Sequence, residues 1–426
     1  MLELNFIREH PDIVEAAVRH KHDKADVKAI LAADARRREL LQTIEALRGE
    51  RNRVSEEIGR LKRDGKDAAG PVAAMRGVGD RIQTLEADLA RVETDLNTRL
   101  AWIPNVPAAD VPVGEDSAGN IEVRRWGTRK EFSFKPLPHW DVGGKLGILD
   151  CARAGKIAGS GFALFLGAGA RLERALYNFM LDLHTGEHGY TEALPPYLAN
   201  RTSMFGCGQL PKLEADMYHL DSDDYFLIPT AEVPLTNIHR DEILREEDLP
   251  RYFAGYTACF RREAGAYGKD TRGLMRVHQF DKVELVKIVA PETSYAELEK
   301  LVANAETVLQ RLGIEYRVVM LCTGDLSFAA AKCYDIEIWA PGLGRYLEVS
   351  SCSNFEAFQA RRANIRYRLK KTGKTDFVHT LNGSGVALAR LAAAVLETYQ
   401  NADGSVTVPE ALRSYMGGMG KITAPA

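Results

Sequence analysis

The sequence predicts an α+β protein: an amino-terminal antiparallel two-helix coiled-coil arm, followed by a domain with an antiparallel sheet flanked by helices. Two observations predict this fold class. Heptad periodicity runs through roughly the first hundred residues and then stops, and the rest of the chain alternates helical and strand-like segments. Because 426 residues exceed one small core, we expect two domains, 1–105 and 106–426.

The first long helix is predicted between Ile30 and Leu61. Its core positions step alternately by three and four residues, which is the spacing of a heptad seam, and two arginines interrupt that seam. These positions are Ile30, Ala33, Arg37, Leu40, Ile44, Leu47, Arg51, Val54, Ile58 and Leu61.

A second helix keeps the same alternation, with one missed position at Arg99. Its core positions are Met75, Val78, Ile82, Leu85, Leu89, Val92, Leu96 and Ile103. The residues between the two helices, 64–71 (DGKDAAGP), have the composition of a turn, so the helices should form an antiparallel hairpin. At a rise of 1.5 Å per residue each arm would reach roughly 45 Å and project into solvent.

The domain boundary is predicted within 102–119, where prolines and glycines replace the heptads. Beyond it, an amphipathic helix is indicated by the apolar positions between Leu172 and Leu183. Short apolar or alternating segments indicate strands of an antiparallel sheet. These segments are Tyr225–Ile228, Phe280–Ile288, Tyr334–Trp339 and Tyr346–Val349.

Composition limits the class of protein. A formal net charge of -3 argues against a surface coated in positive charge, so a nucleic-acid contact would need a local basic surface. There is no signal-peptide pattern and no apolar stretch of the ~20 residues that a membrane span needs, so we expect a cytoplasmic protein without a membrane partner. The six cysteines are scattered singly, and neither disulfides nor a structural zinc is expected.

The common nucleotide-binding and metal motifs do not occur. The sequence has no G-x-x-x-x-G-K-[ST], and no G-x-G-x-x-G between a strand and a helix. His184 and His188 have helical spacing, but Gly186 and Gly189 interrupt it, which favours a helix end over a metal pair.

A candidate nucleotide site lies in 260–284, FRREAGAYGKDTRGLMRVHQFDKVE. Arg261 and Glu263 fall on one strand, a Gly-rich polar loop follows, and Arg276, Phe280 and Glu284 fall on or before the returning strand. Arginine can clamp a phosphate, glutamate can accept from an adenine amino group, and phenylalanine can stack on a base. The alternative is a solvated hairpin with surface ion pairs.

This segment resembles motif 2 of the class II aminoacyl-tRNA synthetases, and the whole chain is similar to bacterial-type seryl-tRNA synthetases. Further blocks carry the resemblance in the family's order. They are TGEHGYTEALPPYL with Pro196 (motif 1), GQLPK at 208–212, IPTAEVPLTN at 228–237, EVSSCSN at 348–354 and HTLNGSGVALAR at 379–390 (motif 3). Together with motif 2 they extend the resemblance over essentially the full length.

The resemblance implies a serine–tRNA ligase: it would form seryl-adenylate from serine and ATP, and transfer serine to tRNA(Ser) and to tRNA(Sec). Its implied catalytic residues are Arg261, on the α-phosphate, and Arg390, on the γ-phosphate. Mg²⁺ is expected on Glu348 and Ser351, because a carboxylate and a hydroxyl form a hard oxygen site. The implied ATP-binding set is Arg261, Arg262, Glu263, Arg276, Val277, Phe280, Glu348, Val349, Ser350, Ser351 and Arg390.

The resemblance also implies a serine-binding set. Thr230, Ala231, Glu232 and Glu284 would surround the ammonium group, and Ser384 would face the substrate hydroxyl. A site built to bond a hydroxyl rejects alanine, because its own buried polar groups would stay unpaired. No stretch remains that is long enough for an editing domain.

The domain roles follow from the same resemblance. Residues 1–105 would bind tRNA, and 106–426 would carry aminoacylation and, through motif 1, the contact of a homodimer. Basic residues on the first helix suit RNA phosphates; the interleaved glutamates taken alone favour a solvated coiled coil, and the resemblance reverses this preference. These basic residues are Arg36, Arg37, Arg38, Arg48, Arg53, Arg60, Lys62 and Arg63, with Lys66 at the tip.

Two alternatives remain open. A paralogue of the family would make seryl-adenylate but deliver serine to a carrier protein or small molecule, and the basic hairpin argues against it. A catalytically inactive relative would bind RNA only and would be expected to lack the motif arginines, whereas Arg261 and Arg390 are both present.

Overall fold

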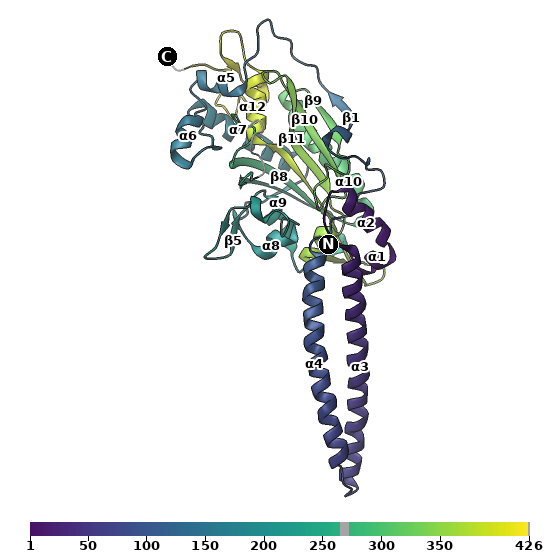
Figure 1. Ribbon diagram of the computed structural model, residues 1–426. Coiled ribbons are helices and arrows are strands. Elements are labelled where there is room, and N and C mark those ends of the chain that lie inside the picture. The colour runs from purple at the N-terminus through teal and green to yellow at the C-terminus, as the bar shows by residue number, and fades with distance from the viewer. Residues whose placement is uncertain (265–271, 425–426) are drawn as a thin grey trace. The chain divides into compact units, whose positions relative to one another are not determined.

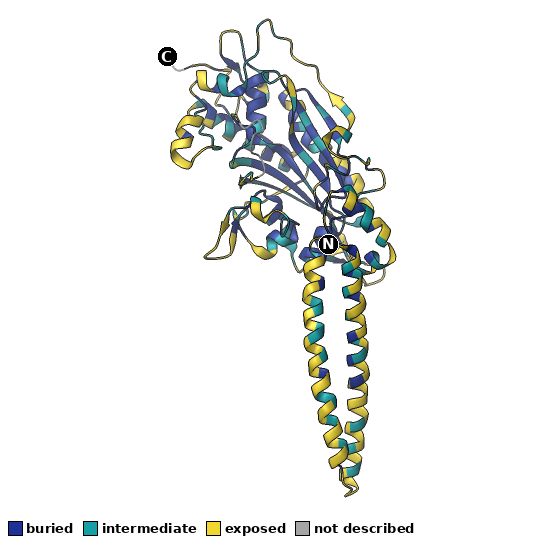
Figure 2. Ribbon diagram, in the orientation of Figure 1, coloured by how far each residue is buried: buried dark blue, intermediate teal, exposed yellow. Residues whose placement is uncertain are grey.

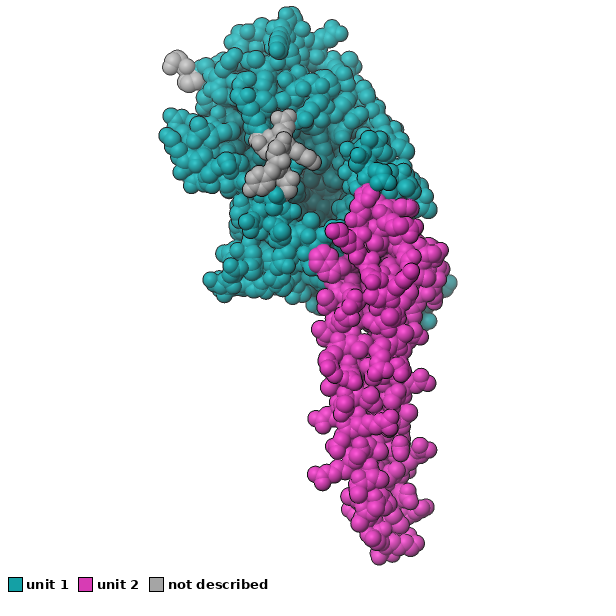
Figure 3. All heavy atoms as spheres, in the orientation of Figure 1, with its two compact units in different colours: residues 1, 105–426 teal, residues 2–104 magenta. Residues whose placement is uncertain are grey.

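The computed structural model describes residues 1–264 and 272–424. It contains two compact units, which Figure 3 colours separately: an amino-terminal unit, Leu2–Pro104, and a carboxy-terminal unit, Asn105–Ala426 with Met1. Among the described residues, none of the helices combines the length and the apolar character needed to cross a bilayer.

The amino-terminal unit consists of two short helices and two long ones. They are α1 (Leu4–Glu9), α2 (Pro11–His20), α3 (Val27–Arg63) and α4 (Ala69–Leu100). The long helices form the antiparallel pair that the heptads predict, and this prediction is confirmed (Figure 1). A side-chain cap begins α3, because the carboxylate of Asp26 accepts a hydrogen bond of 2.9 Å from the backbone N–H of Ala29.

The contact between α3 and α4 follows the heptad positions. Ile44, Leu47 and Ile82 are buried in it, whereas most other positions on both helices are exposed (Figure 2). Arg37, one of the two arginines that interrupt the predicted seam, reaches Glu93 of α4 at 2.9 Å. At Arg37, an ion pair between the two helices therefore takes the place of an apolar contact.

The connection between the two long helices is shorter than predicted. The expected turn spans 64–71, but α4 already begins at Ala69. Pro71 is compatible with this start because the first turn of a helix needs no donor from its backbone nitrogen.

The carboxy-terminal unit is built on an eight-stranded sheet whose strand order is β1-β9-β10-β11-β14-β8-β7-β2. All neighbouring strands are antiparallel except β2 and β7. This confirms the predicted antiparallel-rich sheet. The strands are β1 (Ile121–Trp126), β2 (Thr191–Glu192), β7 (Arg251–Phe260), β8 (Gln279–Val289), β9 (Tyr316–Met320), β10 (Lys332–Ala340), β11 (Arg345–Asn354) and β14 (His379–Ala387).

One face of this sheet is covered by three helices, α7 (Ala168–Gly186), α10 (Ser294–Leu312) and α12 (Leu388–Thr398). Strand residues such as Val283, Leu285 and Ile336 pack against them in the main core. Side chains alternate between the faces of a strand, so the residues between these point to the other side. On that other face, the polar side chains of the candidate site lie beside residues such as Val286 and Ile288, which pack in smaller apolar clusters.

Smaller elements surround the sheet. A three-stranded sheet of β3 (Leu198–Asn200), β5 (Tyr225–Leu227) and β4 (His219–Leu220) lies with α8 (Arg201–Gly206) and α9 (Glu232–Thr236). A second combines β13 (Thr375–Phe377), β12 (Arg366–Arg368) and β6 (Ile243–Arg245), beside α11 (Phe358–Ala363). The remaining α-helices and strands of the described residues are α5 (His139–Lys145), α6 (Cys151–Ala158), β15 (Val406–Thr407) and β16 (Lys421–Ile422).

Candidate active site

A pocket of about 780 Å³ lies in the carboxy-terminal unit, lined by alternate residues of β8, β10, β11 and β14. It gathers twelve of the sixteen predicted site residues. These twelve are Thr230, Glu232, Arg261, Glu263, Arg276, Val277, Phe280, Glu348, Val349, Ser351, Ser384 and Arg390. Segments more than 150 residues apart in sequence thus meet at one site, as expected from the motifs.

Three of the other four predicted residues lie outside the lining: Ala231 and Ser350 behind the wall, and Arg262 at the surface. Ala231 is fully buried. Ser350 is also buried, and its hydroxyl donates to the carbonyl of Ser384 at 2.6 Å. The backbone N–H of Arg262 donates to the carbonyl of Asp216 at 2.8 Å.

Glu284, the fourth, is fully buried and does not line the pocket. Its carboxylate lies 2.5 Å from the ammonium group of Lys282 and accepts from the amide of Asn382 at 2.8 Å. Lys282 and Asn382 do line the pocket. Glu284 therefore acts on the pocket indirectly, by holding Lys282 and Asn382 and by its negative charge.

An aromatic ring that can stack on a base, that of Phe280, lies with two arginines near the ends of β7 and β8. The guanidinium of Arg261 lies 5.2 Å from the ring centre of Phe280, within cation–π range. Arg276 pairs with Glu263 at 3.0 Å. An aromatic face, two guanidinium groups and a carboxylate can bind the base and the phosphates of a nucleotide.

A group of oxygen ligands lies where β10 and β11 pair. Asp335 is directly opposite Ser351 in the strand register, and both line the pocket with Glu348. Burial, and then the negative charge of Glu348, raises the pKa of Asp335 well above its usual range, while a hydrogen bond from Ser351 opposes this rise. A divalent cation would relieve the repulsion between the two carboxylates, so these side chains fit a hard cation.

Arg390, near the start of α12, contacts these oxygen ligands. Its guanidinium donates to the carbonyl of Glu348 at 2.6 Å and lies 3.3 Å from the carboxylate of the same residue. Within the described ranges, no group of three or more His, Cys, Asp or Glu side chains is arranged to hold a metal ion. Two carboxylates and a hydroxyl would need oxygen atoms from a phosphate ligand to complete a coordination shell.

A buried carboxylate marks another part of the pocket. Glu232 is only 6% exposed, and its carboxylate accepts from the amide of Gln359 at 2.6 Å. Thr230 accepts from Lys282 at 2.8 Å and so fixes the neighbouring cation. Burial, and then the negative charge of Glu284, raises the pKa of Glu232 to about 7. Such a carboxylate can receive a small ammonium group and become fully ionised on binding it.

The motif 3 strand changes register beside the pocket. β14 pairs regularly with β8 up to Ser384 and resumes at Ala387, with a bulge between them. Val386 in this bulge has a φ of 108°, a region that side chains rarely adopt, least of all β-branched ones. Because Ser384 and Arg390 both line the pocket, the bulge lies between two site residues and contributes to their directions.

The connection between α8 and β4, residues 207–217, supplies a side wall, which includes the pocket residues Gln209, Leu213, Asp216 and Met217. Asp216 connects this wall to motif 2. Its backbone carbonyl accepts from Arg262, and its carboxylate accepts from the backbone N–H of Ala264 at 3.0 Å. The wall therefore holds the chain just before the Gly-rich loop, whose residues 265–271 lie outside the described residues.

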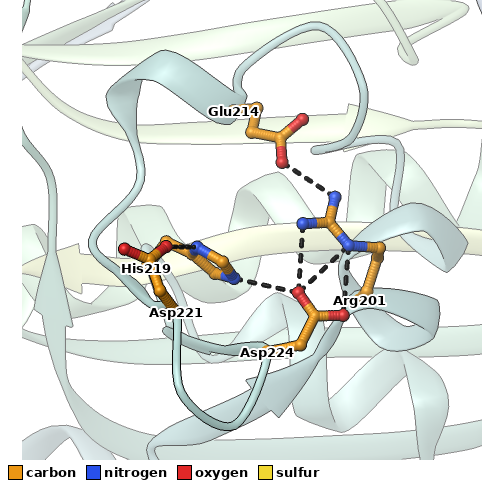
Figure 4. Close-up of polar contacts among 5 residues, drawn as sticks. All are labelled: Arg201, Glu214, His219, Asp221 and Asp224. Carbon is orange, nitrogen blue, oxygen red and sulfur yellow. Dashed lines mark hydrogen bonds and ion pairs between the residues drawn. The ribbon is translucent and has the colours of Figure 1, made fainter.

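Four of the five polar side chains drawn in Figure 4 form a connected cluster beside this wall. Arg201, at the start of α8, lies 2.8 Å from Glu214 and 3.0 Å from Asp224. His219 lies 2.9 Å from Asp224, and this contact raises the pKa of His219. The cluster joins α8, the turn before Asp216 and the β4–β5 hairpin. It is exposed and lies outside the pocket lining.

Sequence reasoning missed several polar residues of the site and its support, among them Lys282, Asp335, Asn382 and Gln359. Lys282 and Asp335 have a signal, since Lys282 lies between Phe280 and Glu284 on one strand face, and Asp335 takes the polar place between Tyr334 and Ile336 in an alternating segment. Asn382 and Gln359 give none, because their roles depend on which strand or helix packs beside them.

Comparisons with known protein families extend the likeness to both units. The family model described as seryl-tRNA synthetase N-terminal domain matches 1–107. The model described as tRNA synthetase class II core domain (G, H, P, S and T) matches 216–399. The second match contains every predicted site residue.

Full-length relatives are similar over nearly the whole chain. A serine–tRNA ligase of Desulforapulum autotrophicum is 56% identical, covering 99% of both chains. One of Geobacillus kaustophilus is 58% identical, covering 98% of this chain and 99% of the relative. Among solved structures, the seryl-tRNA synthetase of Pyrococcus horikoshii complexed with ATP is 38% identical with a TM-score of 0.95, and covers 100% of both chains.

Proposed function

This chain belongs to the seryl-tRNA synthetase family, and we propose on that premise that it activates serine with ATP and transfers the serine to tRNA(Ser). One observation carries the proposal: a single pocket combines the Arg261–Phe280 pair, the oxygen ligands around Glu348 and the buried carboxylate of Glu232. These groups match the three parts of the reaction, which are a nucleotide, its phosphates and an amino acid.

In the first step, the carboxylate of serine attacks the α-phosphorus of ATP, seryl-adenylate forms and pyrophosphate leaves. The nucleophile is already ionised, so the enzyme needs no covalent intermediate and acts by alignment and charge neutralisation. Arg261 would contact the α-phosphate and Arg390 the γ-phosphate, while Phe280 stacks on the adenine. Glu263 would accept from the adenine amino group, which requires it to share or release Arg276.

Mg²⁺ would be held by Glu348 and Ser351, with Asp335 beside them. When bound, it would neutralise phosphate charge and fix the phosphate geometry. The raised pKa of Asp335 supports this assignment, because two carboxylates facing one another without a cation are unfavourable.

Glu232 would receive the ammonium group of serine, with Thr230 and Ala231 forming the rest of that loop. Glu284 would contribute from behind the wall, through its charge and through Lys282 and Asn382. Ser384 would face the substrate hydroxyl. The rejection of alanine would then follow from buried polar groups that are left unpaired.

Transfer to tRNA is the role we propose for the α3–α4 hairpin. Helix α3 carries ten Lys and Arg residues against six Asp and Glu, so it is locally basic in a chain whose net charge is -3. A basic helical hairpin can lie along RNA phosphates and recognise shape. We extend the proposal to tRNA(Sec), to a homodimer formed through motif 1, and to action in the cytoplasm, where these substrates occur.

Serine-dependent exchange of pyrophosphate into ATP tests the proposal. The full chain is assayed with Mg²⁺ and serine, with alanine, threonine, cysteine and glycine as controls. Exchange with serine that Arg261→Ala abolishes, and that Arg245→Ala leaves intact, would support it. Arg245 is a matched control because it is exposed and pairs with Asp248 outside the pocket. Absence of exchange from folded protein would refute the assignment and favour an RNA-binding protein without catalysis.

A further inference from the structure

Gln359 is a buried residue of α11 that lies behind the amino-acid part of the pocket and does not line it. Its amide nitrogen donates to the carboxylate of Glu232 at 2.6 Å and to the backbone carbonyl of Cys207 at 3.1 Å. Its amide oxygen accepts from the hydroxyl of Thr380 at 2.7 Å.

These three contacts fix the orientation of the amide. The carbonyl of Cys207 can only accept a hydrogen bond, so the NH₂ group must face Cys207 and Glu232, and the oxygen must face Thr380. A flipped amide would oppose oxygen to oxygen at two contacts. One side chain thus connects the wall at Cys207, the strand at Thr380 and the carboxylate of Glu232.

The environment of Glu232 gives this contact a consequence. Glu284 on β8 faces it with negative charge, Lys282 on β8 and Arg261 beyond β7 face it with positive charge, and the buried thiol of Cys207 lies nearby. Hydrogen bonds to the ionised form of a carboxylate stabilise that form against burial. Gln359 is the neutral donor in this set and holds the carboxylate from the side away from the cavity.

We propose that Gln359 is a positioning residue of the amino-acid subsite, whose amide holds the carboxylate of Glu232 in the orientation that receives the substrate's ammonium group. The proposal rests on serine as the substrate of the pocket. It predicts that loss of the amide weakens serine binding and leaves ATP binding and the chemical step largely unchanged. It also predicts that Glu232 then ionises at higher pH, because one donor to its charged form is gone.

The test measures serine-dependent pyrophosphate exchange by the full chain between pH 6 and 9. For Gln359→Leu we expect the KM for serine at pH 7.5 to rise about tenfold, in line with one hydrogen bond to a charged group. The kcat and the KM for ATP should stay within about twofold. The pH midpoint of the KM for serine should move upward. Thr380→Val, which frees the amide to rotate, should shift both serine quantities in the same direction by a smaller factor.

Gln400→Leu is the matched control. Gln400 is also buried, and its amide donates to the carbonyls of Leu137 and Glu397, both at 2.9 Å, away from the pocket. It should lower stability without moving the serine KM or its pH midpoint. If Gln359→Leu changes the KM for serine and for ATP equally, or leaves the pH midpoint in place, the inference is wrong while the enzyme assignment stands.

Two further outcomes separate the inference from its premise. A wild-type chain that exchanges no pyrophosphate with serine refutes both the proposed function and the role of Gln359. If Gln359→Leu fails to fold, as judged by circular dichroism, Thr380→Val decides the matter. An unchanged serine KM and pH midpoint in that folded variant would overturn the inference.

Discussion

At the scale of single residues, the site depends on acidic side chains that lie close together. Glu232 and Glu284 are both buried acids, and Lys282 lies 2.5 Å from Glu284. Asp335 and Glu348 form a second acidic pair in the same pocket. Neither pair is fully neutralised by the protein's own side chains, which is the state expected of a site completed by a cationic substrate group and a metal ion.

The pH dependence of serine binding tests the first pair. The pKa of Glu232 is raised to about 7, so its ionised fraction falls as the pH drops through that value. An ammonium group then loses its counter-charge. We expect the KM for serine to rise below about pH 7, approaching tenfold per pH unit for one required ionisation. Steady-state exchange between pH 5.5 and 8 measures this, and a flat profile for serine would contradict it.

The metal requirement tests the second pair. Asp335→Asn removes one of the two carboxylates, so we expect the Mg²⁺ concentration for half-maximal exchange to rise about tenfold, with little change in the KM for serine. Titration of Mg²⁺ at saturating ATP measures the effect. Glu337→Gln on the same strand is the control, because Glu337 pairs with Arg317 at 2.6 Å and does not line the pocket. An equal change in both variants would remove Asp335 from the metal site.

At the scale of elements, the wall that includes Asp216 connects an exposed polar cluster to the chain before the Gly-rich loop. Asp216 accepts hydrogen bonds from the backbone N–H groups of Arg262 and Ala264. These two bonds fix the direction of the motif 2 backbone at residue 264. The buried apolar residues of this wall, Cys207, Leu210 and Met217, belong to a small cluster that is separate from the main core. Side-chain networks such as that of Arg201 therefore contribute to its order.

Asp216→Ala should raise the KM for ATP several-fold, because the lost acceptor lets the start of the motif 2 loop move while Arg261 stays intact. The KM for serine should change less. The comparison variant is Asp221→Ala, since Asp221 is exposed and contacts His219 alone among the residues of Figure 4. Steady-state exchange kinetics for both substrates distinguish the two variants. Equal ATP affinities in the two would mean that the contact of Asp216 with Ala264 does not contribute to ATP binding.

The long hairpin gives a prediction about charge. Arg53, Arg60 and Lys62 are exposed on α3. Replacing all three with glutamine should weaken tRNA binding by about tenfold or more and reduce its dependence on salt concentration. Pyrophosphate exchange without tRNA should stay unchanged. Filter binding at several salt concentrations measures the first effect, and an unaltered salt slope would place the RNA contact elsewhere.

At the scale of the whole molecule, the predictable parts are those with a local period or a recognisable motif. The heptads predict α3 and α4, and residues of several motifs meet in one pocket. The roles of Asn382 and Gln359 depend on strand register and helix packing, which no local pattern in one sequence encodes. Glu284 illustrates the same limit, since its motif is recognisable but its place behind Lys282 follows only from the folded sheet.

The alternation of the central strands also has a genetic consequence. On β8, Val283 and Leu285 pack into the main core, while Phe280 and Lys282 line the pocket. Substitutions at neighbouring residues of β8 should therefore cause different kinds of defect. Substitutions at Val283 or Leu285 should destabilise the fold and give temperature-sensitive alleles, which higher expression partly rescues. Substitutions at Phe280 or Lys282 should weaken substrate binding and give alleles that a higher substrate supply rescues. Saturation mutagenesis of β8 would then show the two kinds of allele alternating with a period of two residues.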